Sequence, residues 1–114
     1  ALESGWITSG PKVLALEKLV AEQIGLTQVA CCNSATSGLM LLLHWYGVTR
    51  GDEVIIPAYT YAATALVVMH MGATPVMVDC RPDFNLDFDQ LKARITPRTK
   101  AIIPVDIAGW PCDY

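Results

Sequence analysis

The residues best suited to hold a ligand are the small polar ones at positions 33–38, with the sequence NSATSG. They lie between a short apolar run and a segment of helical spacing, so they mark the start of a helix. Backbone N–H groups at a helix start have no partner inside the helix and favour a phosphate, and small side chains allow it to come close. Since Ser and Asn are also the usual capping residues, an ordinary helix cap is the alternative for this stretch.

Two further stretches place polar or aromatic side chains just after a predicted strand. Tyr59 and Tyr61 follow an apolar run at residues 53–57, where an aromatic ring could stack on a planar ligand. The alternative is that both are partly buried core aromatics whose hydroxyls reach water. Asp106 follows the last apolar run. Its carboxylate is either functional or a cap for the next turn.

Helices and strands alternate along the chain, and this order predicts an α/β fold: a mostly parallel sheet with helices on both faces. Strands buried on both faces read as continuous apolar runs. Ligands bind outside the carboxyl ends of such strands, which would gather the three stretches at one edge. We expect helices at residues 11–24, 35–46 (largely buried), 61–71 and 88–95, and strands at residues 27–32, 53–57, 74–79 and 100–105.

Capping residues mark where the predicted helices begin. Ser9 or Gly10 can cap the first helix, and Pro11 suits its first turn because Pro is favoured there. Thr60 is the expected cap of the third helix and Asp87 that of the fourth. These assignments fix the order of the elements and leave no linker or repeat between them.

The composition excludes several classes of protein. The chain has 114 residues, of which 53% are hydrophobic and 17% charged, so it is not disordered. A net charge of −3 argues against a nucleic-acid-binding surface. Apolar stretches are too short for a membrane span, and the first residues do not form a signal peptide. Buried strands explain part of the apolar excess, and a surface that packs against something else is the other explanation.

Cysteine and histidine spacing predicts neither a disulfide scaffold nor a metal site. The four cysteines include the adjacent pair Cys31 and Cys32 but no C-x-x-C motif, which favours a reduced, cytoplasmic protein. His44 and His70 have no Cys or Asp at ligand spacing, so we expect no metal.

Taken together, the motifs resemble the DegT-type sugar aminotransferases, which use pyridoxal phosphate. The resemblance covers the whole chain and is strongest to enzymes that aminate 4-keto sugar nucleotides for lipopolysaccharide or nonulosonic-acid pathways. It implies the large domain of the fold-type I transferases, with residues 1–114 as its N-terminal portion. The matching segments are SGWITSGP (4–11), NSATSGL (33–39), GDEVI (51–55), PAYTYAAT (57–64), GATPV (72–76) and ITPRTKAI (95–102).

The resemblance implies roles for individual residues. Ala35 and Thr36 would donate backbone N–H groups, with the Thr36 hydroxyl, to the cofactor phosphate, and Tyr61 would stack on the pyridine ring, where many relatives have Phe or Trp. Thr8, Ser9 and Ser34 would lie on the sugar-nucleotide side. Asp106 stands where many relatives have His, which weakens any transfer of substrate identity.

The same resemblance places the Schiff-base lysine, and the aspartate that holds the pyridine nitrogen, beyond Tyr114. None of the lysines present (Lys12, Lys18, Lys92 and Lys100) stands in the family's lysine motif, so the chain alone is expected to be inactive. The first residue is not Met, which indicates a trimmed chain or a fragment.

Three functions remain open from the sequence. In the first, the whole enzyme transfers an amino group from glutamate to a keto sugar nucleotide, working as a homodimer. In the second, it is a sugar dehydratase of the same family, in which His replaces the lysine. In the third, the chain is a regulatory or otherwise non-catalytic protein.

Overall fold

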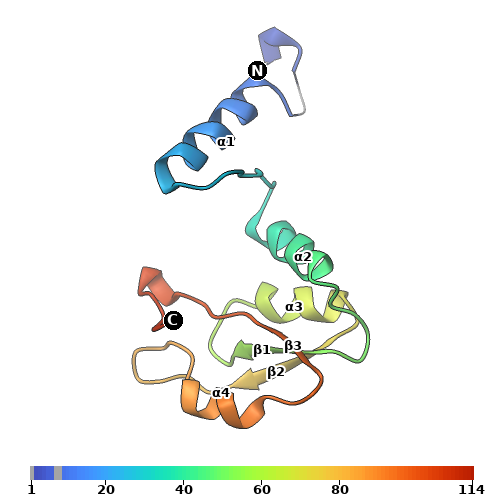
Figure 1. The fold of residues 1–114 in the computed structure, drawn as a ribbon, viewed down its shortest axis with the longest axis vertical. Helices are drawn as coiled ribbons and strands as arrows, with labels where there is room; N and C mark the ends of the chain where they lie inside the picture. Colours follow the sequence, from blue (N-terminus) through green and yellow to red (C-terminus); the bar gives the residue numbers. More distant parts are fainter. Residues whose placement is uncertain (1, 7–8) are drawn as a thin grey trace. The chain divides into compact units, whose positions relative to one another are not determined.

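A computed structural model describes residues 2–6 and 9–114, in which the chain divides into two units, Ala1–Asn33 and Ser34–Tyr114 (Figure 1). The first unit contains a short 3-10 helix, η1 (Leu2–Ser4), and α1 (Pro11–Ile24). Gly10 is the cap residue of α1 and Pro11 occupies its first turn, as expected from the sequence. Gly25 ends the helix with a φ of 70°, a conformation that glycine adopts at little cost.

The strand expected at residues 27–32 is wrong, because these residues have no regular secondary structure. A strand requires a neighbouring strand to accept and donate its backbone hydrogen bonds, and an apolar run alone does not supply one. Here the Cys31 N–H donates instead to Oε1 of Glu17 on α1, at 2.8 Å.

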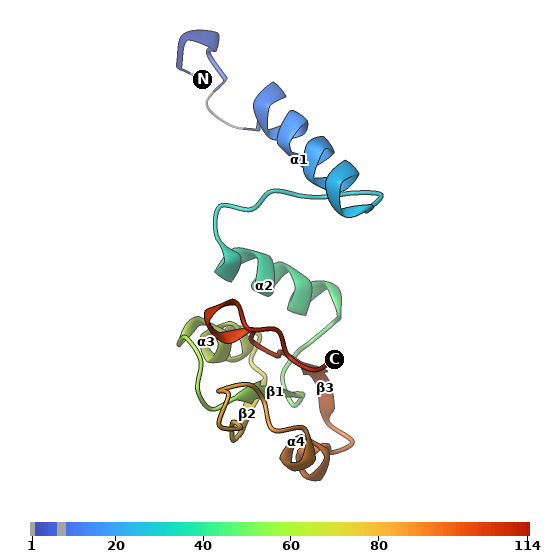
Figure 2. The same cartoon turned by 90° about the vertical axis from the view of Figure 1, so that its left-hand side faces the viewer.

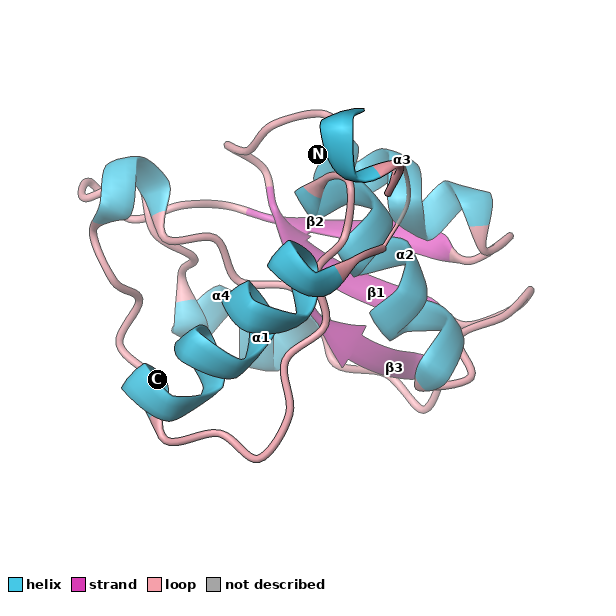
Figure 3. Cartoon of the chain, turned by 90° about the horizontal axis from the view of Figure 1, so that it is seen from above, coloured by secondary structure: helices cyan, strands magenta, loops and turns pink. Residues whose placement is uncertain are grey.

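The second unit is built on three parallel strands: β1 (Glu53–Pro57), β2 (Thr74–Val78) and β3 (Thr99–Ile102). Their order is β2-β1-β3, so β1 lies in the middle (Figure 3). Glu53 pairs with Thr74 on one side and with Thr99 on the other, which aligns the beginnings of all three strands. The parallel sheet predicted from the sequence is therefore confirmed.

Helices cover both faces of the sheet. One face carries α2 (Ala35–Trp45) and α3 (Ala63–His70), and the other carries α4 (Phe88–Arg94), as Figures 1 and 2 show. A 3-10 helix, η2 (Ile107–Gly109), follows β3. The α/β fold with helices on both faces agrees with the sequence.

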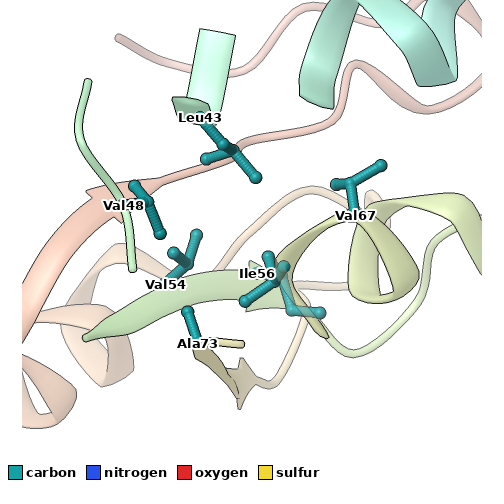
Figure 4. Close-up of a cluster of buried hydrophobic side chains, with 7 residues drawn as sticks. Leu43, Val48, Val54, Ile56, Val67 and Ala73 are labelled. Atoms are coloured by element: carbon teal, nitrogen blue, oxygen red, sulfur yellow. The ribbon is translucent and has the colours of Figure 1, made fainter. Parts of the chain in front are cut away.

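The side chains of β1 alternate between two hydrophobic clusters. Val54 and Ile56 face the cluster that includes Leu43 of α2 and Val67 of α3 (Figure 4). Ile55 faces the opposite cluster, which Val78, Leu86 and Leu91 complete. The middle strand therefore packs against helices on both faces of the sheet. Each Å² of its apolar surface removed from water stabilises the fold by roughly 25 cal/mol.

Two expectations for the helices need correction. We expected α2 to be largely buried, but Leu43 is its buried residue, and Trp45 is 84% exposed. We also expected Thr60 to cap a helix starting at Tyr61, whereas α3 starts at Ala63 after Ala62. The Thr60 hydroxyl is hydrogen-bonded to the Thr64 hydroxyl at 2.8 Å and so does not satisfy a backbone donor of the first turn.

Asp87 caps α4 as expected. Its carboxylate accepts hydrogen bonds from the backbone N–H groups of Asp89 (3.0 Å) and Gln90 (3.3 Å). The Gln90 side chain also donates to this carboxylate at 3.2 Å. These bonds, with the Gln90 backbone N–H contributing most, hold the pKa of Asp87 below its usual range.

Candidate cofactor-binding edge

The beginnings of α2 and α3 lie at the same end of the sheet as the carboxyl ends of the strands. The chain passes from the end of α2 into the start of β1, and α3 returns from the end of β1 to the start of β2. Figure 1 shows both helices starting on the side of the sheet where the arrowhead of β1 lies. We call this end of the sheet, with the residues that follow each strand, the carboxyl edge.

The first turn of α2 leaves two backbone donors free. Ser34 is extended (φ −160°, ψ 157°), and its Oγ accepts a hydrogen bond from the Ser37 N–H at 3.1 Å. The carbonyl of Ser34 accepts from the Gly38 N–H at 3.1 Å. Among the described residues, nothing accepts from the N–H groups of Ala35 and Thr36, which precede the first bond of the helix. Ser34 therefore does cap the helix, and capping still leaves two N–H groups without an acceptor beside it.

Tyr61 presents its ring to solvent just before α3. Its side chain is 81% exposed, and its carbonyl accepts a hydrogen bond from the Thr64 N–H at 3.0 Å. Tyr59 is 58% exposed, so neither tyrosine is the partly buried core residue that the sequence left open. An exposed ring at this edge is available to stack on a planar molecule.

Asp106 organises the loop that follows it. Its Oδ1 accepts hydrogen bonds from the Cys112 N–H and from the Tyr114 hydroxyl, both at 2.9 Å. The bond from Cys112 is the main reason that the pKa of Asp106 is lowered, and the bond to Asp106 raises the pKa of Tyr114. Asp106 is the cap residue of η2 by position, but its carboxylate makes no capping bond there and instead holds the loop up to Tyr114.

The structure brings together some of the predicted site residues. Ser34, Ala35 and Thr36 share one turn of α2, and Tyr61 lies ahead of α3 at the same edge. Ser9 is exposed and belongs to the first unit, and Thr8 lies outside the described residues.

Sequence reasoning missed a polar cluster at the opposite, amino end of the sheet. The buried Glu53 carboxylate accepts from the Thr96 hydroxyl at 2.6 Å and from Nε of Arg98 at 2.9 Å. Arg98 Nη2 also pairs with Glu53. The Thr96 hydroxyl, followed by Arg98, holds the pKa of Glu53 below its usual range. The sequence feature that could have indicated this cluster is the charged Glu53 at the start of an apolar strand.

Phe84 was also missed. Its ring lies 5.2 Å from that of Tyr59, with an angle of 41° between the ring planes. The backbone φ of Phe84 is 68°, a left-handed value that a bulky residue rarely adopts. The preceding Pro82 and Asp83 are typical turn residues, but they do not indicate which ring Phe84 contacts.

The residues present fit a phosphorylated planar cofactor. Two free N–H groups and the positive end of the α2 dipole suit a phosphate, and the exposed Tyr61 ring suits a flat heterocycle. Within residues 2–6 and 9–114, no group of three His, Cys, Asp or Glu side chains is arranged to hold a metal ion. None of the helices described has the length and apolar character needed to cross a bilayer.

Comparison with known sequences shows the family to which the chain belongs. The model of the DegT/DnrJ/EryC1/StrS aminotransferase family matches residues 1–114. The spore coat polysaccharide biosynthesis protein SpsC of Bacillus subtilis is 44% identical over 113 residues, covering 98% of this chain and 29% of SpsC. GDP-perosamine synthase of Caulobacter vibrioides is 46% identical over 114 residues, covering 98% of this chain and 31% of the synthase. The chain thus spans less than a third of the curated relatives it matches.

Solved structures of sugar aminotransferases have the same fold over this chain. Spr1654 of Streptococcus pneumoniae, described as a sugar aminotransferase, matches in its PMP-form with a TM-score of 0.94 and 50% identity. The match covers 98% of this chain and 28% of Spr1654. NtdA of Bacillus subtilis, solved with bound cofactor PMP, has a TM-score of 0.94 and 37% identity, over 99% of this chain and 26% of NtdA. The structural neighbours therefore include aminotransferases bound to PLP or PMP.

Proposed function

The chain belongs to the DegT/DnrJ/EryC1/StrS aminotransferase family, and on that premise we propose that it is the N-terminal part of the cofactor-binding domain of a sugar aminotransferase. One observation carries the proposal: two unpaired backbone donors on α2 share an edge with an exposed aromatic ring before α3. A phosphate and a flat ring joined in one molecule, as in pyridoxal phosphate, match that pair of features.

In this proposal the first turn of α2 binds the phosphate. The N–H groups of Ala35 and Thr36 donate to its oxygens, and the hydroxyl of Thr36, a half-buried residue, adds a third donor. The α2 dipole favours the negative charge. Ser34 keeps the turn in shape by accepting from the Ser37 N–H, so the donors are preorganised before the phosphate arrives.

Tyr61 supplies the platform for the pyridine ring. When bound, the cofactor supplies an electron sink for chemistry at the carbon that carries the amino group. The chain's own contribution is to bind and orient the phosphate and the ring. We propose that the lysine and the aspartate that complete the site come from the part of the family's length that this chain does not span.

The proposed reaction transfers an amino group from glutamate to a keto sugar nucleotide, for an amino sugar of a cell-surface polysaccharide. GDP-perosamine synthase and SpsC, by their names, belong to sugar and polysaccharide synthesis. Ser34 lies beside the phosphate-binding turn, and we propose it, with Ser9 and Thr8, for the sugar-nucleotide side. The whole enzyme is proposed to work as a cytoplasmic homodimer.

The test uses the full-length protein that contains this chain. Purified protein should carry a visible absorbance from bound pyridoxal phosphate, and glutamate should change it. With a panel of keto sugar nucleotides, mass spectrometry should find a product that has gained an amino group. Loss of water in place of that gain would identify a dehydratase, and protein that binds no pyridoxal phosphate would overturn the proposal.

A further inference from the structure

Two loops of the carboxyl edge meet through a pair of rings. Tyr59 belongs to the loop between β1 and α3, which also carries Tyr61, and Phe84 belongs to the loop between β2 and α4. Their centroids are 5.2 Å apart, within the range of favourable aromatic pairs. Both rings are more than half exposed, at 58% for Tyr59 and 54% for Phe84. The pair is therefore separate from the two hydrophobic clusters that stabilise the sheet.

The loop that carries Phe84 is held by its own backbone. The Arg81 N–H donates to the Asn85 carbonyl at 2.9 Å, and the Phe84 N–H donates to the Arg81 carbonyl at 2.8 Å. Asn85 is 4% exposed, and its Nδ2 donates to the Pro111 carbonyl at 3.1 Å, which ties the turn to the chain after β3. An antiparallel bridge between Cys80 and Leu86 closes the base of the loop.

These bonds fix Phe84 in an unfavourable conformation. At a φ of 68° the Cβ atom crowds the backbone, and glycine or asparagine is the usual residue there. A phenylalanine at such a position gives up local backbone stability. What it provides in this structure is an aromatic ring against Tyr59, at a place that the turn determines.

The loop that carries Tyr59 has fewer supports. The Ala58 N–H donates to the Val78 carbonyl at 2.8 Å, and the Thr60 and Thr64 hydroxyls are hydrogen-bonded at 2.8 Å. The Tyr61 carbonyl accepts from the Thr64 N–H at 3.0 Å, which holds the backbone of Tyr61 but not its ring. Within the described part of the chain, no hydrogen bond involves Tyr59 itself. Its ring contact with Phe84 is thus a side-chain link to the loop between β2 and α4, in addition to the backbone bond from Ala58 to the end of β2.

We propose that Phe84 is a positioning residue of the cofactor site, acting through Tyr59 to hold the loop that places the Tyr61 ring. This inference rests on the proposed function, because it takes Tyr61 as the platform for the pyridine ring. Phe84 does not itself touch the cofactor in this proposal. Its removal should loosen the platform while the phosphate-binding turn of α2 stays intact.

The experiment measures binding of pyridoxamine 5′-phosphate to the full-length apoprotein by titration calorimetry. Phe84→Gly removes the ring and also relieves the positive φ, so it should fold. We expect it to raise Kd about three- to fivefold, which is within the range for loss of one aromatic pair. Tyr59→Ala should have the same effect, and Tyr59→Phe, which keeps the ring, should restore the wild-type Kd.

A double-mutant cycle separates positioning from general destabilisation. In a Tyr61→Leu background, Phe84→Gly should change Kd less than about twofold, because the ring that it positions is already absent. Two results would overturn the inference and leave the proposed function standing. One is a double variant whose increase in Kd equals the product of the increases for Phe84→Gly and Tyr61→Leu. The other is an unchanged Kd for Phe84→Gly alone. Wild-type protein that does not bind the ligand would overturn both the inference and the proposed function.

Discussion

The two ends of the parallel sheet differ in how their polar groups are used. At the amino end, the buried Glu53 carboxylate is occupied by the Thr96 hydroxyl and the Arg98 guanidinium. At the carboxyl edge, the N–H groups of Ala35 and Thr36 are unpaired among the described residues, and the Tyr61 ring is exposed. The same strands support both ends, so the difference lies in the residues placed beyond them.

This difference separates stability from binding. A buried carboxylate must be compensated by donors, and the amino end supplies them from the turn before β3. Donors at a helix start that remain unpaired favour an anion from outside the chain. Substitutions at the amino end should therefore leave ligand affinity unchanged, and those that remove a free N–H or the exposed ring at the carboxyl edge should lower it. Four substitutions in the full-length protein test that division.

The largest effect is expected for Ala35→Pro. Proline is favoured at the first helical position, and the extended Ser34 before it is compatible, so the fold should persist without the N–H. Loss of one charge-assisted hydrogen bond should raise the Kd of pyridoxamine 5′-phosphate about 10- to 100-fold. Titration calorimetry measures this, with Ala35→Ser as the control that keeps the N–H. Equal loss of affinity for pyridoxamine, which has no phosphate, would contradict the assignment.

Tyr61→Leu should have the next largest effect. Replacing the ring by an aliphatic chain removes stacking, so Kd should rise about three- to tenfold for pyridoxamine 5′-phosphate and for pyridoxamine alike. Tyr61→Phe keeps the ring and should bind within about twofold of wild type. If the Kd is the same for wild type, Tyr61→Leu and Tyr61→Phe, Tyr61 does not contact the cofactor.

Ser34→Ala tests the turn itself. It removes the acceptor of the Ser37 N–H and should lower the free energy of unfolding in urea by about 1 kcal/mol, the usual cost of a lost helix cap. Ser34→Asp restores a capping acceptor and adds a negative charge. It should recover stability while weakening binding of the phosphate, and a stable variant with undiminished affinity would argue against a phosphate at this turn.

The smallest effect at neutral pH is expected for Glu53→Gln, because the Arg98 side chain is 68% exposed and solvent screens the pair. The informative measurement is the pH dependence of unfolding. The pKa of Glu53 is lower in the folded protein than in the unfolded chain. As the pH falls, the unfolded chain therefore takes up a proton at Glu53 before the folded protein does. Stability falls as the pH drops below the usual glutamate pKa, about 4.3.

In Glu53→Gln this fall in stability at low pH should disappear. Thr96→Val removes the hydroxyl that contributes most to lowering the pKa of Glu53, so it should make the fall shallower. Cofactor affinity should be unchanged in both variants. If Glu53→Gln or Thr96→Val changes the Kd of the cofactor, the two ends of the sheet are coupled rather than independent.

Local signals in the sequence predicted much of the fold. The β-branched run Glu53–Pro57 forms the expected strand, and Asp87 caps the expected helix, because each depends on residues close in the chain. The strand expected at residues 27–32 failed because an apolar run does not specify its neighbour. The exposed Trp45 on α2 has the same origin, since burial depends on which elements pack against a helix.

The candidate site was predictable only in part. The small polar residues before α2 indicated unpaired N–H groups, and the structure contains them at Ala35 and Thr36. The contact between Tyr59 and Phe84 joins distant positions through a turn with a positive φ, and no residue spacing encodes such a contact. Roles of Ala35, Thr36, Tyr61, Ser34, Ser9 and Thr8 toward ligands stay predictions.

The strand order β2-β1-β3 also has a kinetic consequence. In the chain, β1 is separated from β2 by one helix, α3, whereas α3, β2, α4 and the intervening turns separate it from β3. Closing the longer loop costs more entropy, so β1, α3 and β2 should assemble first, with β3 docking afterwards. Glu53 then meets Thr96 and Arg98 late in folding, and the amides of β3 should be the first of the sheet to exchange with solvent.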